Sequence, residues 1–295
     1  MRRRLRKLAN AYACFLIAIL FIIGTFPLVS SERGEHKCIQ AMRSFATNVF
    51  GIFNRLNASR HVRAAERMLS EGNLSGAEAH LQNALKLDPK SFAAYLHLVT
   101  LHLIRKDVKG ADEVLKRAKA YLPTEQLSYL YTTAGDCCAF FVPMDVKVME
   151  RYYREALKLY PKNATALNNY GYALAERGIK LDEAERMIKS ALKLEPNNAA
   201  FIDSLGWVYY KQGRYDEAVK WLEKAVGLQS NDAELRYHLG MAYIAVGRID
   251  EARLQLEEAL RINPKHVGAN EALKELEREQ EKIRQREKEP TGEMA

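Results

Sequence analysis

The feature that most constrains the fold is a spacing of alanines and prolines that recurs along the chain. An alanine is followed by a second alanine seven residues later, and a proline follows five residues beyond that. The pattern occurs at Ala77/Ala84/Pro89, Ala111/Ala118/Pro123, Ala184/Ala191/Pro196 and Ala252/Ala259/Pro264. Ala184, Ala218 and Ala252 follow one another at a constant interval. A period of about 34 residues predicts a solenoid of stacked units, each of which buries its apolar face against its neighbours.

Paired glycines define the unit as a helical hairpin. One glycine of each pair follows a leucine or tyrosine, at Gly171, Gly206 and Gly240. The other comes seven residues later, at Gly178, Gly213 and Gly247. We expect the earlier glycine to let the paired helix approach closely, and the later one to end the first helix in a left-handed turn. The proline then stops the second helix and begins a new unit.

This pattern resembles the tetratricopeptide repeat family, whose unit is about 34 residues long. The unit from Ala199 matches it with Leu205, Gly206, Tyr209, Gly213, Tyr215, Ala218 and Ala225, while Ser230 replaces the proline. The resemblance implies an all-α fold, a right-handed α-solenoid of about six hairpins. The predicted units are 58–91, 92–125, 126–163, 164–198, 199–232 and 233–266.

The third unit departs from the pattern. Pro123 and Pro161 stand four positions further apart than the period, and Met149 occupies the place where the small alanine is expected. We therefore expect the surplus to form a longer loop at Ala139–Asp145. The fourth unit carries one extra residue.

Segment 1–31 has the composition of a membrane-spanning or signal helix. Five basic residues among the first seven precede an uncharged apolar run, Leu8–Phe26. Such a run nearly spans the roughly 30 Å hydrocarbon core of a bilayer. It is interpreted either as a retained single-pass anchor of the cell membrane or as a signal peptide cleaved near Val29 and Ser31. The body is extracytoplasmic in both cases, and it is periplasmic or secreted if the segment is removed.

Two segments flank the repeats. Segment 32–57 is predicted to contain an amphipathic helix, with apolar residues at Met42, Phe45, Val49, Phe53 and Leu56. This helix is interpreted either as a cover over the first repeat or as a helix lying on the membrane surface. Segment 267–295 is predicted to be a capping helix over Val267–Leu276 that continues into a charged tail.

Composition and motifs argue against several functional classes. Removing the five N-terminal charges from a net charge of +8 leaves +3, so no nucleic-acid surface is expected. Phosphate-binding glycine motifs, a GxSxG elbow and an HExxH helix are missing from the sequence. We therefore expect no enzyme activity, cofactor, metal or small-molecule substrate. The adjacent Cys137 and Cys138 are interpreted as buried thiols.

The resemblance implies a binding groove along the first helix of each hairpin. Carried over to this chain, the groove positions are Asn168, Asn169, Tyr172, Asp203, Trp207, Tyr210, Tyr237, Met241 and Ile244. A helical wheel turns Trp207 some 160° away from Leu205, so Trp207 lies outside the packing seam. Contact with a partner is favoured for Trp207, and packing against a neighbouring first helix is the alternative. A clamp for a partner's terminal carboxylate is not expected, because Ala200, Ser204, Glu234 and His238 replace its basic residues.

These features predict a scaffold that binds a protein or peptide outside the cytoplasm, in the assembly of an envelope complex. The alternative is an accessory subunit that positions an enzyme, such as an envelope polysaccharide transferase or synthase.

Overall fold

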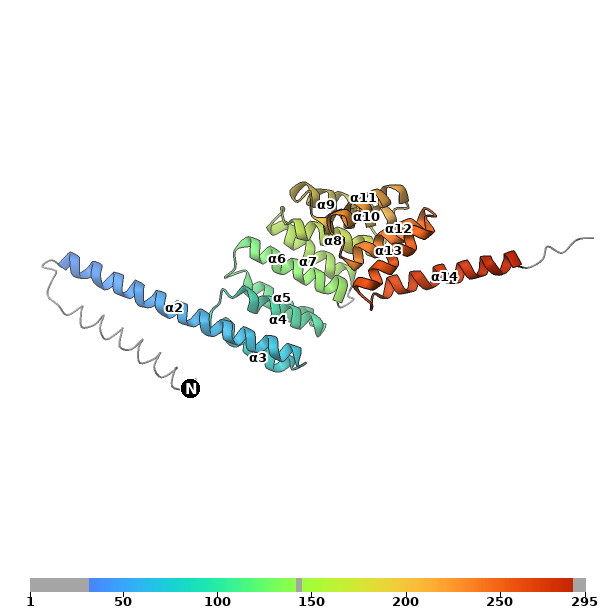
Figure 1. The fold of residues 1–295 in the computed structure, drawn as a ribbon. Helices are drawn as coiled ribbons and strands as arrows, with labels where there is room; N and C mark the ends of the chain where they lie inside the picture. Colours follow the sequence, from blue (N-terminus) through green and yellow to red (C-terminus); the bar gives the residue numbers. More distant parts are fainter. Residues whose placement is uncertain (1–31, 142–144, 289–295) are drawn as a thin grey trace, which may run out of the picture. The chain divides into compact units, whose positions relative to one another are not determined.

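In the computed structural model, every described element is helical (Figure 1). The structure describes residues 32–141 and 145–288. The helices are α2 Glu32–Ser70, α3 Leu74–Leu87, α4 Phe92–Ile104, α5 Val108–Ala118, α6 Thr124–Asp136, the π-helix η1 Cys137–Phe141, α7 Val146–Leu159, α8 Ala164–Glu176, α9 Leu181–Leu194, α10 Ala199–Lys211, α11 Tyr215–Leu228, α12 Ala233–Ala245, α13 Ile249–Ile262 and α14 Val267–Lys288. The predicted all-α solenoid is confirmed. The predicted anchor or signal run, Leu8–Phe26, lies outside the described residues. Among those described, no helix is both long and apolar enough to cross a membrane.

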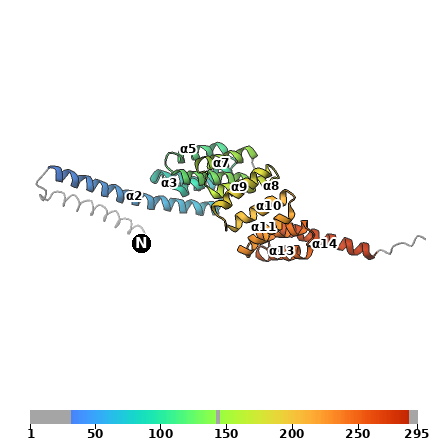
Figure 2. The same cartoon turned by 90° about the horizontal axis from the view of Figure 1, so that it is seen from above.

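The chain divides into two compact parts at Leu98 and Val99, within α4. In the first part, α2 packs against α3 through the buried residues Ala58, Val62 and Ala65. α2 is one uninterrupted helix, so the predicted separate helix within 32–57 and the start of the first repeat at residue 58 are not distinct elements. No proline interrupts this stretch, and Gly51 alone does not break the helix. The N-terminal half of α2 extends beyond α3 (Figures 1 and 2).

The second part consists of hairpins in which α8 pairs with α9, α10 with α11 and α12 with α13. Gly206 shows why the small residue is needed: a Cβ there would lie 2.7 Å from Cγ of Leu222. Gly171 and Gly240 face Ile188 and Leu256 in the same way. The predicted close approach of the paired helices at these glycines is therefore confirmed.

The turns inside the hairpins share one hydrogen-bond arrangement. At Gly213, which has a φ of 76°, the amide donates to the carbonyl of Tyr210, and the amide of Arg214 donates to the carbonyl of Tyr209. This paired bonding around a left-handed residue is the Schellman motif. It recurs at Gly72, Gly178 and Gly247, and at Lys106, where a side-chain-bearing residue adopts a φ of 60°.

An arginine after each of two turns joins successive hairpins. Arg214 donates to Glu217 at 2.6 Å on its own second helix and to Glu185 at 3.0 Å on the preceding one. Arg248 repeats this with Glu251 at 2.6 Å and Glu223 at 3.2 Å. The two guanidinium groups also lie over the rings of Tyr209 and Tyr243, at 4.1 Å and 4.2 Å. We call each arrangement an arginine clasp.

The third repeat differs from the prediction at its extra residues. Residues 139–141 were expected to be loop, but they belong to η1, which continues α6. A π-helix accommodates added residues by widening the turn. Arg177, directly after α8, donates to the carbonyl of Ala139 in this segment at 2.8 Å. Cys137 and Cys138 are buried thiols, as predicted. Burial raises the pKa of Cys138 to about 12, so this thiol is unreactive near neutral pH.

Candidate functional site

The predicted groove residues lie on α8, α10 and α12, the first helices of three successive hairpins. The structure gathers several of them in one aromatic cluster. The ring of Trp207 stacks on Tyr210 at 4.7 Å and on His238 at 4.0 Å, and it lies 6.2 Å from Tyr237. Tyr172 joins from α8, 6.1 Å from His238. The rings of three neighbouring first helices are thus in mutual contact.

Trp207 is part of the packing between first helices. Only 4% of its surface is exposed, and its Nε1 donates a hydrogen bond to Glu176 on α8. The favoured interpretation of Trp207 as a partner contact is therefore wrong in this structure. The ring packs against neighbouring first helices, which was the alternative interpretation. The helical wheel correctly excludes Trp207 from the seam within its own hairpin, but it carries no information about the flanking first helices, which cover the ring.

Asp203 also serves an internal role, because it pairs with His238 on α12. Nδ1 of His238 lies 2.9 Å from Oδ2 of Asp203, and its Nε2 lies 3.4 Å from Glu234. Burial alone would lower the pKa of His238, but the two carboxylates outweigh burial and raise it to about 10. Its hydrogen bond to His238 in turn lowers the pKa of Glu234. His238 is therefore a buried cation at neutral pH, and His266 adds a second contact to Glu234 at 3.0 Å.

The two predicted asparagines on α8 bond within the protein. Asn169 donates to Asp136 at 3.1 Å, and Asp136 also accepts from the hydroxyl of Tyr153 at 2.6 Å. Burial raises the pKa of Asp136, and these two hydrogen bonds oppose the rise. Asn168 is buried and donates to Asn169 at 3.2 Å. Asn169 therefore joins α8 to the preceding hairpin, and Asn168 bonds to it within the same helix.

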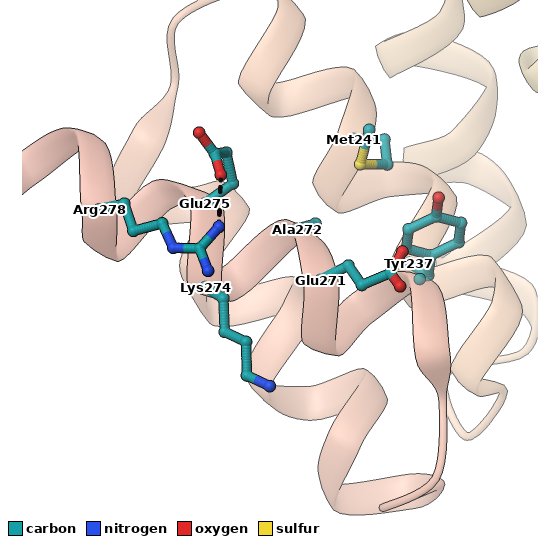
Figure 3. Close-up of a pocket in the computed structure, with 8 residues that line it drawn as sticks. Tyr237, Met241, Glu271, Ala272, Lys274, Glu275 and Arg278 are labelled. Atoms are coloured by element: carbon teal, nitrogen blue, oxygen red, sulfur yellow. Dashed lines mark hydrogen bonds and ion pairs between the residues drawn. The ribbon is translucent and has the colours of Figure 1, made fainter.

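An open pocket of about 440 Å³ lies between α12 and α14 (Figure 3). Of the predicted groove residues, Tyr237 and Met241 line it. Its other lining residues are on α14: Gly268, Glu271, Ala272, Lys274, Glu275 and Arg278. Gly268 makes room for the aromatic wall, because a Cβ there would lie 2.8 Å from Cζ of Tyr237.

The pocket combines an apolar wall with charges of both signs. Arg278 and Glu275 pair with each other at 3.3 Å, as the dashed line in Figure 3 marks. Lys274 and Glu271 form no ion pair with any side chain that the structure describes. Figure 3 shows Glu271 directed toward Tyr237 and Lys274 directed away from it. The pocket thus offers one uncompensated charge of each sign beside an aromatic ring and a thioether.

The remaining predicted residues, Tyr210 and Ile244, are half-buried and do not line this pocket.

His238 was not identified from the sequence as a structural residue, because this position was considered only as an unsuitable clamp residue. The sequence separation of Asp203 and His238 is close to one repeat length. It therefore predicts that an acid and a base lie together on adjacent first helices. Lys274 and Arg278 were missed because the last helix was interpreted only as a cap. No cluster of potential metal ligands occurs among the described residues.

Comparisons with known proteins agree with this architecture. Two family models described as tetratricopeptide repeat match residues 68–132 and 152–186. A model described as anaphase-promoting complex, cyclosome, subunit 3 matches residues 178–259. No curated protein sequence matches the chain at a significant level.

Solved structures share the fold at low sequence identity. A chain of the APC/C hetero-tetramer Cut9–Hcn1 matches with a TM-score of 0.55 and 21% identity, over 75% of this chain and 42% of that chain. PilF of Pseudomonas aeruginosa matches at 0.53 and 19%, over 75% and 99%. PilW, described as a type IV pilus biogenesis factor, matches at 0.55 and 20%, over 73% and 98%.

The hairpins, their glycine contacts and the aligned first helices define an all-helical repeat scaffold. The chain belongs to the tetratricopeptide repeat family.

Proposed function

We propose that this chain is a non-catalytic adaptor that binds a segment of another protein along its first helices, with the pocket between α12 and α14 as the main contact. The observation that carries this proposal is the composition of the pocket. It is open, it exposes the ring of Tyr237 and the thioether of Met241, and it holds two charges without described partners. Aromatic and methionine side chains are typical of protein-binding surfaces.

The pocket favours a partner segment with an apolar side chain between charged residues. An apolar side chain fits against Tyr237 and Met241, where its burial contributes about 1.5–3 kcal/mol. An acidic group of the partner is complementary to Lys274, and a basic group is complementary to Glu271. Electrostatic complementarity of this kind sets the register of the bound segment more than its affinity.

We further propose that the adaptor is anchored at a membrane and acts in the assembly of an envelope complex. The support is the basic cluster followed by the apolar run Leu8–Phe26, with the repeats on the far side by the positive-inside rule. PilW, which has the same fold, is described as a pilus biogenesis factor, and this is compatible with an assembly role here.

The test is a cross-linked pull-down of the full chain from intact membranes, with mass spectrometry of the captured proteins and of the chain's own N-terminus. We expect Met241→Asp and Lys274→Glu each to reduce capture of the main partner at least about fivefold. The matched control is Leu254→Asp, which places the same charge at a 56% exposed leucine on the second helix α13. Trp207→Ala is unsuitable as a probe, because Trp207 is buried and its loss changes stability.

Unchanged capture by both pocket variants would contradict the pocket assignment. Equal loss with Leu254→Asp would show that the partner contacts the second helices as well. A mature N-terminus beyond Phe26 would replace the anchored form with an exported one.

A further inference from the structure

The middle of α2 carries an apolar surface that no described element covers. Its large side chains are exposed by 43–66% of their surface: Val49, Phe50, Ile52, Phe53 and Leu56. Five exposed apolar residues within two helical turns are costly in water and mark a contact surface.

This apolar surface lies on the side of α2 that faces away from α3. At about 100° per residue, Val49, Ile52, Phe53 and Leu56 fall within an arc of about 100°. The residues that α3 covers lie on the opposite side of α2, about 180° away: Ala58, Val62 and Ala65. A cap over the first repeat requires apolar residues on the side that faces α3. Val49, Ile52, Phe53 and Leu56 therefore do not continue the α2–α3 interface.

The same side of α2 continues into a row of arginines. Arg60, Arg63 and Arg67 project within the arc defined by Val49, Ile52, Phe53 and Leu56, and all three are exposed. Arg60 bonds only to Asn57, at 3.2 Å, and the side chains of Arg63 and Arg67 contact no carboxylate among the described residues. The sequence between Glu35 and Glu66 contains five basic residues and no acidic one.

We propose that this face of α2 binds an anionic lipid surface, with Val49–Leu56 inserted among the acyl chains and the arginines at the headgroups. An apolar face joined to basic residues is the composition of helices that lie on membranes. Val49 also follows closely on the apolar run Leu8–Phe26 in the sequence, which keeps α2 close to a bilayer if that run is an anchor. The surface proposal therefore fits the anchored form proposed above but does not require it.

The experiment compares the full chain on vesicles of phosphatidylcholine alone and of phosphatidylcholine with about 30% phosphatidylglycerol, at about 0.1 M salt. Flotation measures association, and hydrogen–deuterium exchange measures protection of residues 47–58. We expect slower exchange in this segment on the anionic vesicles only. Phe50→Ser/Phe53→Ser removes the protection, and Arg63→Ala and Arg67→Ala each weaken it about fivefold. Leu194→Ser/Leu254→Ser, at exposed leucines of second helices, leaves it unchanged.

The outcomes separate this proposal from the anchor. If the chain floats on both vesicles while residues 47–58 exchange as in solution, the lipid surface is wrong and the anchor stands. If the chain floats only on anionic vesicles and the phenylalanine variant abolishes flotation, the lipid surface stands and the anchor is wrong. Protection that depends on protein concentration and not on lipid identifies a second copy as the occupant and overturns the proposal, as does a chain that floats on neither vesicle.

Discussion

A protonated imidazole lies against an indole ring in the interior of the repeats. His238 stacks on Trp207 and is held by the carboxylates of Asp203 and Glu234. Removing one member of such a buried charged group leaves its partners uncompensated, which is strongly destabilising. Asp203 and Trp207, both predicted as groove residues, therefore maintain the alignment of α10 with α12 through their contacts with His238.

Because His238 is charged in the folded protein, the free energy of unfolding is expected to decrease at alkaline pH. Its pKa is about 10 in the folded protein and 6.5 for an ordinary histidine, so the folded state binds the proton more tightly. The stabilisation is complete below pH 6.5 and is lost as pH rises toward 10. We expect the free energy of unfolding, measured with urea, to fall by about 3 kcal/mol between about pH 7 and 9.5 from this group.

The control for this prediction is His238→Gln, which removes the titrating group and retains a polar side chain. The variant is expected to be less stable at pH 7 and to show a flatter dependence on pH, so that the two curves converge near pH 10. Parallel curves would show that other groups cause the alkaline loss.

At the residue scale, the sequence locates the site only in part. Tyr237 and Met241 are predicted groove residues, and they line the pocket. Trp207 and Asp203 are assigned to the same surface, yet they are buried. A repeat position states which helix face a residue occupies. It does not state whether neighbouring side chains cover that face, as the rings of Tyr210 and His238 cover Trp207 here.

At the scale of the element, each hairpin depends on a glycine at the point where its two helices come closest. A Cβ at Gly171 would lie 2.9 Å from the carbonyl oxygen of Ala184 and 2.7 Å from Cγ1 of Ile188. A backbone oxygen cannot move aside as a side-chain end can. We therefore expect Gly171→Ala to reduce the free energy of unfolding by about 1–3 kcal/mol.

The matched control is Gly227→Ala in α11, where a Cβ would meet nothing within 4 Å. This substitution is expected to stabilise the protein by about 0.5–1 kcal/mol, because alanine favours helix over glycine. Chemical unfolding of both variants tests the pair. Equal effects would mean that helix propensity, and not the packing distance, governs Gly171.

The turn at Lys106 is an element under strain. Four equivalent turns use glycine, whereas Lys106 adopts the left-handed conformation with a side chain. Lys106→Gly is expected to raise the free energy of unfolding by about 0.5–1 kcal/mol, because relief of strain exceeds the added freedom of the unfolded chain. Gly213→Lys makes the opposite change at an equivalent turn, and a gain in stability there would contradict the explanation.

The elements with a regular period are predictable, and the exceptions are not. The spacing from Gly171 to Gly178 predicts both a close contact and a turn, and both are present. The spacing cannot show that residues 137–141 widen a helix, since a π-helix and a loop absorb added residues equally well. The continuity of α2 across residue 57 is also hidden, because neither interpretation of its apolar residues specifies where the helix ends.

The array as a whole ends on α14, which covers the last hairpin through Ala269 and Leu276. Arg253 of α13 also donates to Gln280 of α14 at 2.6 Å. In a repeat protein a unit packs mainly against its neighbours, so damage at one end stays largely local. We expect truncation after His266 to speed hydrogen exchange in α12 and α13 but not in α8. An equal rise in α8 would indicate a single cooperative unit.

The arginine clasps allow the number of repeats to increase by duplication of a gene segment. Residues 214–247 contain the clasp arginine Arg214, the glutamate that it meets on its own second helix, and Glu223, which Arg248 meets. If this segment were duplicated in tandem, the second copy of Arg214 would contact Glu223 and Tyr243 of the first copy. Arg248 would then contact Glu223 and Tyr243 of the second copy. The gene segment already encodes both halves of the junction. A longer array can therefore arise by duplication alone, with no compensating substitution at the joint.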